Sequence, residues 1–107
     1  MDQFLSFKNF LNSRKKEKIY KGSTAVITGG SGRIGSIFTN QLLLNGHTVI
    51  SLSRNKAQFE NFKKNLPKKL QKKITWYFMD LSLPESIENI IKIIKTRHRK
   101  INILINN

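Results

Sequence analysis

The chain contains no cysteine, only two histidines and only six acidic side chains among its 107 residues. Without cysteine it forms no disulfide framework and no thiolate metal site, and it offers no cysteine nucleophile. His47 and His98 lie too far apart in the sequence to indicate a zinc site. No apolar run approaches the roughly 18 residues of a membrane span, and residues 1–21 lack the apolar core of a secretory signal. These absences predict a cytoplasmic protein without a bound metal.

The scarcity of acidic residues leaves most of the 20 lysines and arginines uncompensated, and the formal net charge is +14. A charge of this size raises the question of a polyanionic partner, such as nucleic acid or a membrane surface. The basic residues are scattered, however, and lysine, isoleucine and asparagine, all abundant here, have A/T-rich codons. No recognised DNA-binding motif accompanies them. We therefore interpret them as solvated faces and do not expect a nucleic-acid or membrane partner.

Residues 1–21 predict a basic amphipathic lead-in helix. Phe4, Phe7 and Leu11 recur at helical spacing among lysines and arginines. Such a helix suits an anionic membrane surface, but we favour an N-terminal arm that packs on the domain or on a partner subunit. Gly22 marks the boundary, so residues 22–107 form the second unit.

From Thr24 onward the sequence alternates short apolar, β-branched runs with amphipathic segments. The runs predict strands at Thr24–Thr28, His47–Ser53, Ile74–Met79 and Ile101–Ile105. The segments between them predict helices at Ile34–Asn45, with Phe38, Leu42 and Leu44 among its apolar positions, and at Lys56–Asn65, then a basic connector at Lys68–Lys73 and a helix begun by the capping box Ser82–Glu85. This alternation predicts an α/β fold, a doubly wound parallel sheet with helices on both faces.

A glycine-rich segment, Gly29–Gly35, lies directly between the first strand and the first helix. The pyrophosphate of a dinucleotide needs backbone N–H groups brought close to it without intervening side chains, which Gly29, Gly30, Gly32 and Gly35 allow. The N-terminus of the following helix adds unsatisfied amides and the positive end of the helix dipole. A glycine-rich string in this strand-to-helix context predicts a site for a nicotinamide dinucleotide.

The residues that follow the second strand indicate which dinucleotide is bound. An acidic residue there bonds the ribose 2′-hydroxyl of NAD, whereas an arginine suits the 2′-phosphate of NADP. This chain has Ser53-Arg54-Asn55 at that point, and Arg33 in the glycine turn is a second cation that can reach the same phosphate. The pattern predicts NADP in preference to NAD.

Asp80 follows the third strand at the edge of the sheet where ligands bind. An acceptor at this position can take a hydrogen bond from the adenine amino group. A strand-end aspartate that caps the next turn is an equally good interpretation from position alone.

Three segments together resemble the short-chain dehydrogenase/reductase family. Thr28–Gly35 is similar to its cofactor loop, Asp80-Leu81 to its adenine-contacting pair, and Ile103–Asn107 to the start of its Asn-Asn-Ala-Gly signature. The resemblance covers residues 22–107 and implies the N-terminal portion of a Rossmann-type sheet, strands 1–4 of the order 3-2-1-4-5-6-7. It implies that the cofactor is bound by Gly29, Gly30, Ser31, Gly32, Arg33, Ile34, Gly35, Ser53, Arg54, Asp80, Leu81, Asn106 and Asn107.

The chemistry of this family moves a hydride between the nicotinamide and a small carbonyl or alcohol substrate, with the help of a serine and a Tyr-x-x-x-Lys pair. Neither Tyr20 nor Tyr77 is followed by a lysine at the fourth residue. The resemblance therefore implies the cofactor-binding part of an NADP-dependent oxidoreductase that is a homo-oligomer in its full-length form. We expect this chain alone to be inactive, marginally stable and prone to aggregate along its fourth strand, as a truncated product or a sequence fragment would be.

Two alternatives stay open. The spacing Gly29-x-x-Gly32-x-x-Gly35 is typical of the family's extended branch of nucleotide-sugar epimerases and dehydratases, and Arg33 stands where the compact branch usually has glycine. The pair Asn106-Asn107 favours the compact branch. A non-catalytic NADP-binding module is the other alternative.

Overall fold

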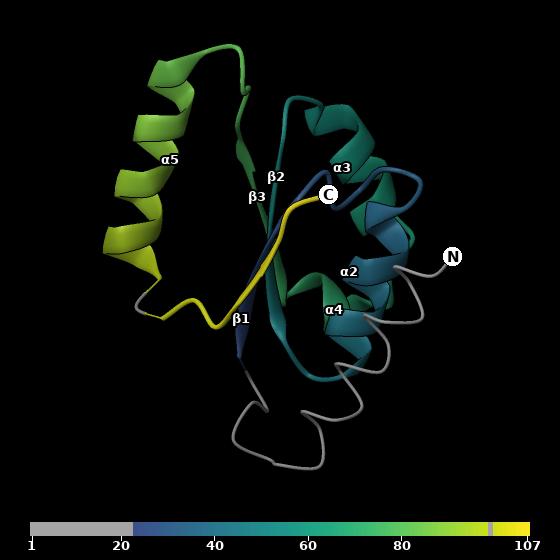
Figure 1. Cartoon of the computed structure of the whole chain (residues 1–107). Helices are drawn as coiled ribbons and strands as arrows, with labels where there is room; N and C mark the ends of the chain where they lie inside the picture. Colours follow the sequence, from purple (N-terminus) through teal and green to yellow (C-terminus); the bar gives the residue numbers. More distant parts are fainter. Residues whose placement is uncertain (1–22, 99) are drawn as a thin grey trace.

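The computed structural model describes residues 23–98 and 100–107 (Figure 1). The predicted lead-in helix of residues 1–21 lies outside them. The described chain alternates strands and helices, and its elements are β1 (Thr24–Thr28), α2 (Gly35–Leu44), β2 (Thr48–Ser53), α3 (Lys56–Lys64), α4 (Lys68–Gln71), β3 (Ile74–Phe78), α5 (Pro84–Arg97) and β4 (Ile103–Ile105). This order confirms the predicted α/β class.

The sheet is parallel, with its four strands in the order β3-β2-β1-β4. Figure 1 shows α2, α3 and α4 over one face of the sheet and α5 over the other. The strand order confirms the predicted 3-2-1-4 portion of a Rossmann-type sheet. Because β2 and β4 flank β1 on opposite sides, the carboxyl ends of β1 and β4 form a topological switch point, the place where doubly wound sheets bind ligands.

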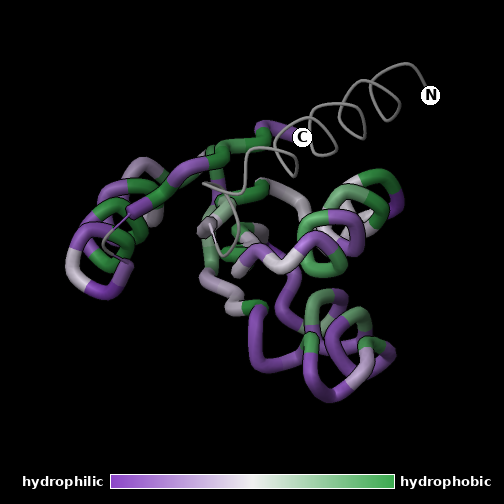
Figure 2. The backbone as a smooth tube through the Cα atoms, turned by 90° about the horizontal axis from the view of Figure 1, so that it is seen from below, coloured by the Kyte–Doolittle hydropathy of each residue, from purple (hydrophilic) through white to green (hydrophobic). Residues whose placement is uncertain are grey.

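Both faces of the two central strands, β1 and β2, are buried, which explains their nearly continuous apolar sequences. Figure 2 shows hydrophobic and hydrophilic stretches alternating along the helices, as expected for helices that pack one face on a sheet. On the side of α2 and α3 the core includes Ala25, Ile27, Phe38, Leu42, Val49, Phe59 and Ile74. On the side of α5 it consists of Val26, Ile50, Leu52 and Ile90.

Several details differ from the predictions. The connector Lys68–Lys73 contains the short helix α4, because Pro67 precedes it in an extended conformation and Leu70 anchors it in the core. β4 begins at Ile103 and not at Ile101, since only Ile103–Ile105 pair with β1. In α2 the predicted positions Phe38 and Leu42 are buried, but Leu44 is 68% exposed and Leu43, 1% exposed, is buried in its place.

The predicted capping box at Ser82–Glu85 is not formed. The Ser82 hydroxyl donates to Asp80 Oδ1 at 2.7 Å, and Leu83 is the N-cap of α5 without a side-chain cap bond. Leu83 precedes Pro84, and the ring of a proline disfavours the helical conformation for the residue before it. The extended φ of −118° and ψ of 95° at Leu83 agree with this constraint, so α5 begins at Pro84.

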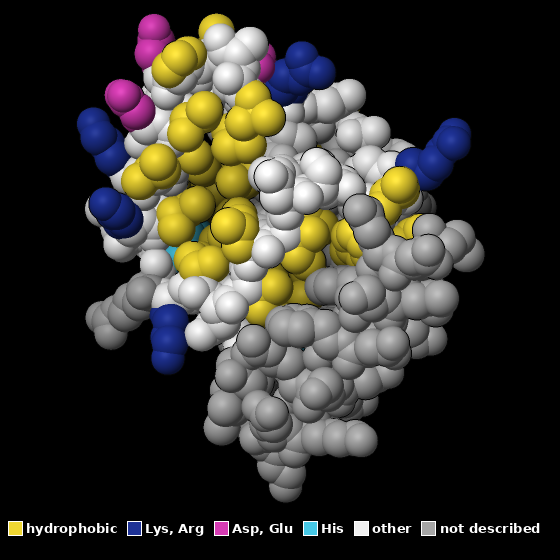
Figure 3. All heavy atoms as spheres, in the orientation of Figure 1, with side chains coloured by type: hydrophobic (Ala, Val, Ile, Leu, Met, Phe, Trp, Pro, Cys, Tyr) yellow, Lys and Arg dark blue, Asp and Glu magenta, His cyan; other side chains and the backbone are white. Residues whose placement is uncertain are grey.

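Apolar side chains also gather on the surface. Figure 3 shows them over α5 and the adjoining part of the sheet. The large exposed apolar side chains of the described residues include Phe78, Leu83 and Ile91, and Leu104 on the edge strand β4 is 72% exposed. No helix in the described part of the chain combines the length and the apolar character needed to cross a membrane.

Candidate cofactor-binding site

The glycine turn begins where β1 ends. Gly29 has a φ of +67°, a left-handed backbone conformation that residues with a side chain rarely adopt. Its backbone N–H donates to the carbonyl of Leu52 at 2.8 Å, and its own carbonyl accepts from the N–H of Gly32 at 3.1 Å. These bonds fix the turn between the end of β2 and the start of α2.

Gly30 and Gly35 are required for a different reason, which is close packing. A Cβ on Gly30 would lie 2.8 Å from Ile27 Cγ2 and 2.9 Å from Ser51 Oγ, and Thr39 also approaches here to donate its hydroxyl to the Gly30 carbonyl at 2.8 Å. A Cβ on Gly35 would collide with the carbonyl oxygen of Gly29.

Gly32 has no such constraint. A Cβ there would find its nearest atom, the Gly29 carbonyl oxygen, at 3.4 Å, an ordinary contact. The packing of the turn thus depends on Gly29, Gly30 and Gly35. The Gly32 spacing that pointed to the extended branch is not demanded by the geometry of this turn.

The first turn of α2 offers an environment for an anion. Its N-cap residue, Ile34, makes no side-chain cap bond, and the first turn contains no acidic residue. The N–H groups of Ser36 and Ile37 donate to the carbonyls of Gly32 and Ile34 at 2.8 and 3.0 Å, and the start of the helix is the positive end of its dipole. Glycines that leave the backbone uncovered, followed by a helix start without a side-chain cap, fit the pyrophosphate of a dinucleotide.

The two asparagines at residues 106 and 107 reach the glycine turn from β4. Asn107 donates its backbone N–H to Thr28 Oγ1 at 2.9 Å and its side-chain Nδ2 to the Gly29 carbonyl at 3.3 Å. Thr28 Oγ1 in turn donates to Asn106 Oδ1 at 3.2 Å. The carboxyl end of β1 and residue 107 therefore meet at the switch point between β1 and β4. Thr28 belongs to the segment that resembles the cofactor loop, but no spacing in the sequence reveals its partners.

The two arginines predicted to select the cofactor are exposed. Arg33 lies in the glycine turn and Arg54 directly follows β2, one residue before Asn55, whose side chain caps α3 by accepting from the Gln58 N–H at 2.9 Å. Within residues 23–98 and 100–107 neither arginine forms an ion pair; the ion pair found there joins Lys56 to Glu60 at 3.9 Å. Both guanidinium groups are available to an anionic ligand.

Asp80 follows β3 and is held by Ser82. The carboxylate oxygen Oδ1 accepts from the Ser82 hydroxyl at 2.7 Å and from its N–H at 2.9 Å. The hydroxyl bond, then the N–H bond, and more weakly the positive charge of Arg54, lower the pKa of Asp80 below its ordinary value. The turn-capping interpretation of Asp80 is thus confirmed. Because both bonds go to Oδ1, the second oxygen, Oδ2, does not compete for them and can accept from a ligand.

The remaining predicted residues differ in exposure. Ile34 is 53% exposed and Leu81 is 74% exposed, so both side chains are open to a ligand. Ser31 is 8% exposed, and within the described residues its Oγ is buried without a hydrogen-bond partner. It lines a groove of about 450 Å³ between α2 and α3, together with the amide side chains Asn40, Gln58, Asn61 and Asn65.

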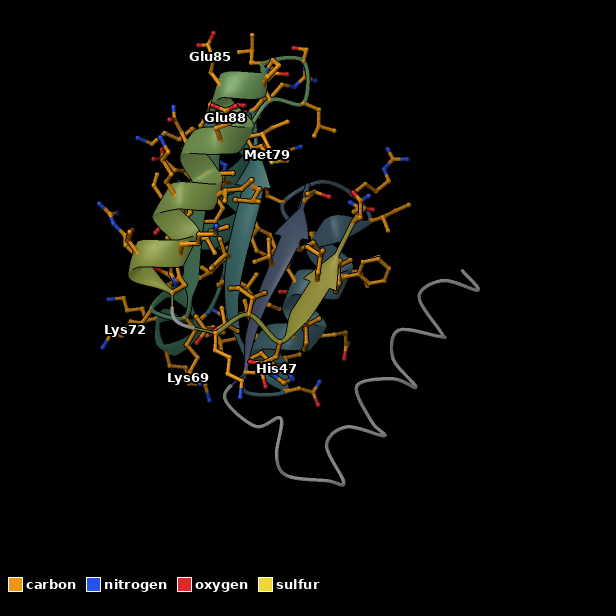
Figure 4. All side chains as sticks on the ribbon, turned by 60° about the vertical axis from the view of Figure 1, so that its left-hand side comes forward. His47, Lys69, Lys72, Met79, Glu85 and Glu88 are labelled. Atoms are coloured by element: carbon orange, nitrogen blue, oxygen red, sulfur yellow. The ribbon has the colours of Figure 1, made fainter. Side chains whose placement is uncertain are left out.

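The histidines lie away from this edge. His47 is 4% exposed, and burial, the largest influence, lowers its pKa below the ordinary value. Figure 4 shows His47, Lys69 and Lys72 toward the opposite end of the sheet from Met79, Glu85 and Glu88. His98 lies at the end of α5, where its Nε2 is 3.1 Å from the hydroxyl of Tyr77. No group of His, Asp and Glu side chains among the described residues is arranged to hold a metal ion.

Comparison with known proteins identifies the family of this site. Residues 23–107 match the family model described as short chain dehydrogenase. The chain is 31% identical over 88 residues to a farnesol dehydrogenase from Aedes aegypti, an alignment that covers 82% of this chain and 36% of that protein.

Solved structures agree. Menthone neomenthol reductase from Mentha piperita has a TM-score of 0.71 at 30% identity, over 79% of this chain and 31% of that one. Salutaridine reductase from Papaver somniferum has a TM-score of 0.67 at 26% identity, over 77% of this chain and 28% of that one.

The chain thus spans about a third of the length of these relatives. They do not favour the nucleotide-sugar alternative or the non-catalytic module. The matched family consists of oxidoreductases that bind NAD(P) on a Rossmann-type sheet. This chain belongs to the short-chain dehydrogenase/reductase family.

Proposed function

We propose that this chain is the cofactor-binding part of an NADP-dependent dehydrogenase or reductase that acts on a small carbonyl or alcohol substrate. The observation that carries the proposal is the pair of exposed guanidinium groups, Arg33 and Arg54, at the carboxyl edge of the sheet, neither of which forms an ion pair with another described residue. A dinucleotide with an additional phosphate on its ribose supplies two more negative charges there. Planar guanidinium groups bind phosphate oxygens in pairs.

Each predicted residue has a separate task in this proposal. The backbone N–H groups that follow Gly29 hold the pyrophosphate, those of Gly30, Ser31, Arg33 and Ile34, because the N–H groups of Gly29, Gly32 and Ser36 donate within the protein. Arg33, Ser53 and Arg54 bind the 2′-phosphate. Asp80 Oδ2 accepts from the adenine amino group, while Ser82 keeps the carboxylate ionised and oriented. Asn106 and Asn107 brace the turn through Thr28 and Gly29, and Ile34 and Leu81 border the bound dinucleotide.

The bound nicotinamide supplies or accepts the hydride of the proposed reaction. The described residues provide binding and orientation but no tyrosine at the switch point. Tyr77 packs on the α5 side of the sheet, where its hydroxyl pairs with His98, and no lysine follows it at the fourth residue. We therefore expect the chain to bind NADPH and to show no turnover by itself.

Isothermal titration calorimetry of the full chain with NADPH and NADH tests the proposal. We expect NADPH to bind at least about 10-fold more tightly, since hydrogen bonds to charged groups contribute about 1.5–3 kcal/mol. Arg33→Ala and Arg54→Ala should each weaken NADPH binding about 10-fold and leave NADH binding nearly unchanged. Arg97→Ala, which removes an exposed cation from the last turn of α5, is the matched control and should alter neither affinity.

Two results would contradict the proposal. Equal affinities of the wild-type chain for NADPH and NADH would exclude the NADP preference. The absence of binding by either dinucleotide to a folded chain would exclude the cofactor-binding role itself.

A further inference from the structure

Trp76, the single tryptophan of the chain, connects three elements next to the cofactor edge. It lies in β3, where it pairs in register with Ser51 of β2. Its indole Nε1–H donates to the hydroxyl oxygen of Ser53 at 2.9 Å. The indole ring also stacks on the ring of Phe59 in α3, with a centroid distance of 6.3 Å and an interplanar angle of 28°.

The indole N–H determines whether the Ser53 hydroxyl donates or accepts in this hydrogen bond. An indole N–H is a donor only, so in this bond the Ser53 oxygen is the acceptor. The single hydroxyl proton of Ser53 then points elsewhere, and the hydrogen bonds among the described residues provide no acceptor for it. Ser53 is the last residue of β2 and adjoins Arg54, so its hydroxyl lies at the carboxyl edge of the sheet, where a ligand can accept this proton.

The same tryptophan also restrains the segment that carries Arg54. On one side of Arg54, the indole N–H holds Ser53. On the other side, Asn55 caps α3, and the buried ring of Phe59 in α3 packs on the indole. Arg54 thus lies between two points that are both fixed to Trp76.

We propose, building on the function proposed above, that Trp76 is a positioning residue for cofactor specificity. By donating to Ser53, it makes the Ser53 hydroxyl a donor toward the 2′-phosphate of NADP. A phosphate accepts only, so a serine with its proton directed outward matches it. The 2′-hydroxyl of NAD is neutral, and the bond it forms with the same donor is weaker, because charge-assisted hydrogen bonds are about twice as strong as neutral ones.

A double-mutant cycle in the full chain tests this role. We expect Trp76→Phe, which keeps an aromatic ring against Phe59 but removes the N–H, to weaken NADPH binding about 10-fold and NADH binding less than about threefold. Ser53→Ala should have the same effect. The double variant should bind NADPH no more weakly than Ser53→Ala, because both changes remove one interaction.

Two control variants separate positioning from packing. Ser53→Thr keeps the hydroxyl and should retain the wild-type ratio of NADPH to NADH affinity, but should lose it when combined with Trp76→Phe. Tyr77→Phe removes the neighbouring polar group on the other face of β3, where it faces His98, and should leave both affinities unchanged.

The outcomes distinguish this inference from the proposed function. A wild-type chain that binds neither dinucleotide contradicts the proposed function. A chain that prefers NADPH, keeps the same affinity ratio in Trp76→Phe and loses it in Ser53→Ala overturns the role of Trp76 alone; a ratio kept in both variants also overturns the role of Ser53. If Trp76→Phe fails to fold, the comparison of Ser53→Ala with Ser53→Thr decides: equal affinity ratios overturn the inference, and loss of the ratio only in the alanine variant supports it.

Discussion

Replacing Gly35 by alanine tests how closely the glycine turn is packed. The added Cβ would collide with the Gly29 carbonyl oxygen and lie 2.8 Å from its carbonyl carbon and 2.9 Å from Asn107 Nδ2. The obstacles are the backbone of the turn and a side chain that is bonded to it. Neither moves without breaking the link between β1, α2 and residue 107.

The size of the effect follows from the cost of overpacking. An extra methyl group in a packed site lowers the free energy of unfolding by about 1–3 kcal/mol. Because the Cβ of Gly35→Ala would meet backbone atoms, we expect the upper end of this range, about 3 kcal/mol. In a domain of this size 1 kcal/mol lowers Tm by about 4–8 °C, so we expect a decrease of about 12–24 °C. Urea and thermal unfolding followed by the fluorescence of Trp76, the single tryptophan, measure both quantities.

Two glycines serve as controls. Gly32→Ala adds a Cβ at ordinary contact distance and should change stability by less than about 0.5 kcal/mol. Gly46→Ala adds a Cβ into open space at a φ of +87°, so it should cost about 1–2 kcal/mol of stability without altering NADPH affinity. If Gly35→Ala has the same Tm as Gly32→Ala, the close packing described for the turn is wrong.

Two further predictions concern pH and self-association. Because burial lowers the pKa of His47 below 6.5, the unfolded chain binds a proton more readily than the folded one. Stability should therefore be fully present above about pH 6.5 and decrease as the pH falls through the folded pKa; urea unfolding at several pH values should show this slope, and His47→Gln should flatten it. Leu104 is 72% exposed on edge strand β4, so Leu104→Lys should reduce self-association at unchanged Tm in light-scattering and melting experiments. Equal self-association of the wild-type chain and the Leu104→Lys variant would contradict the edge-strand explanation.

The fold was predictable because its main signals are local. Continuous apolar runs such as Thr24–Thr28 predict strands buried on both faces, and the glycine turn and Pro84 mark where helices begin. The failed predictions depended on competition between partners. Ser82 had two hydrogen-bond partners available, the N-terminus of α5 and Asp80, and the extended conformation required before Pro84 removed the first.

The same distinction applies to the site. The location of Arg54 and Asp80 at the same edge of the sheet was predictable because the carboxyl ends of parallel strands meet there, whatever the details of packing. The bond from Trp76 to Ser53 depends in addition on register, because side chains along a strand alternate between the faces of the sheet. A shift of β3 by one residue would move Trp76 to the α5 side and leave the Ser53 hydroxyl without its donor. The observed pairing of Trp76 with Ser51 puts the indole on the same face as Ser53, within reach of its oxygen. The places of the residues proposed to contact the cofactor are therefore set by topology, whereas the bond from Trp76 to Ser53 is set by the register of the neighbouring strand.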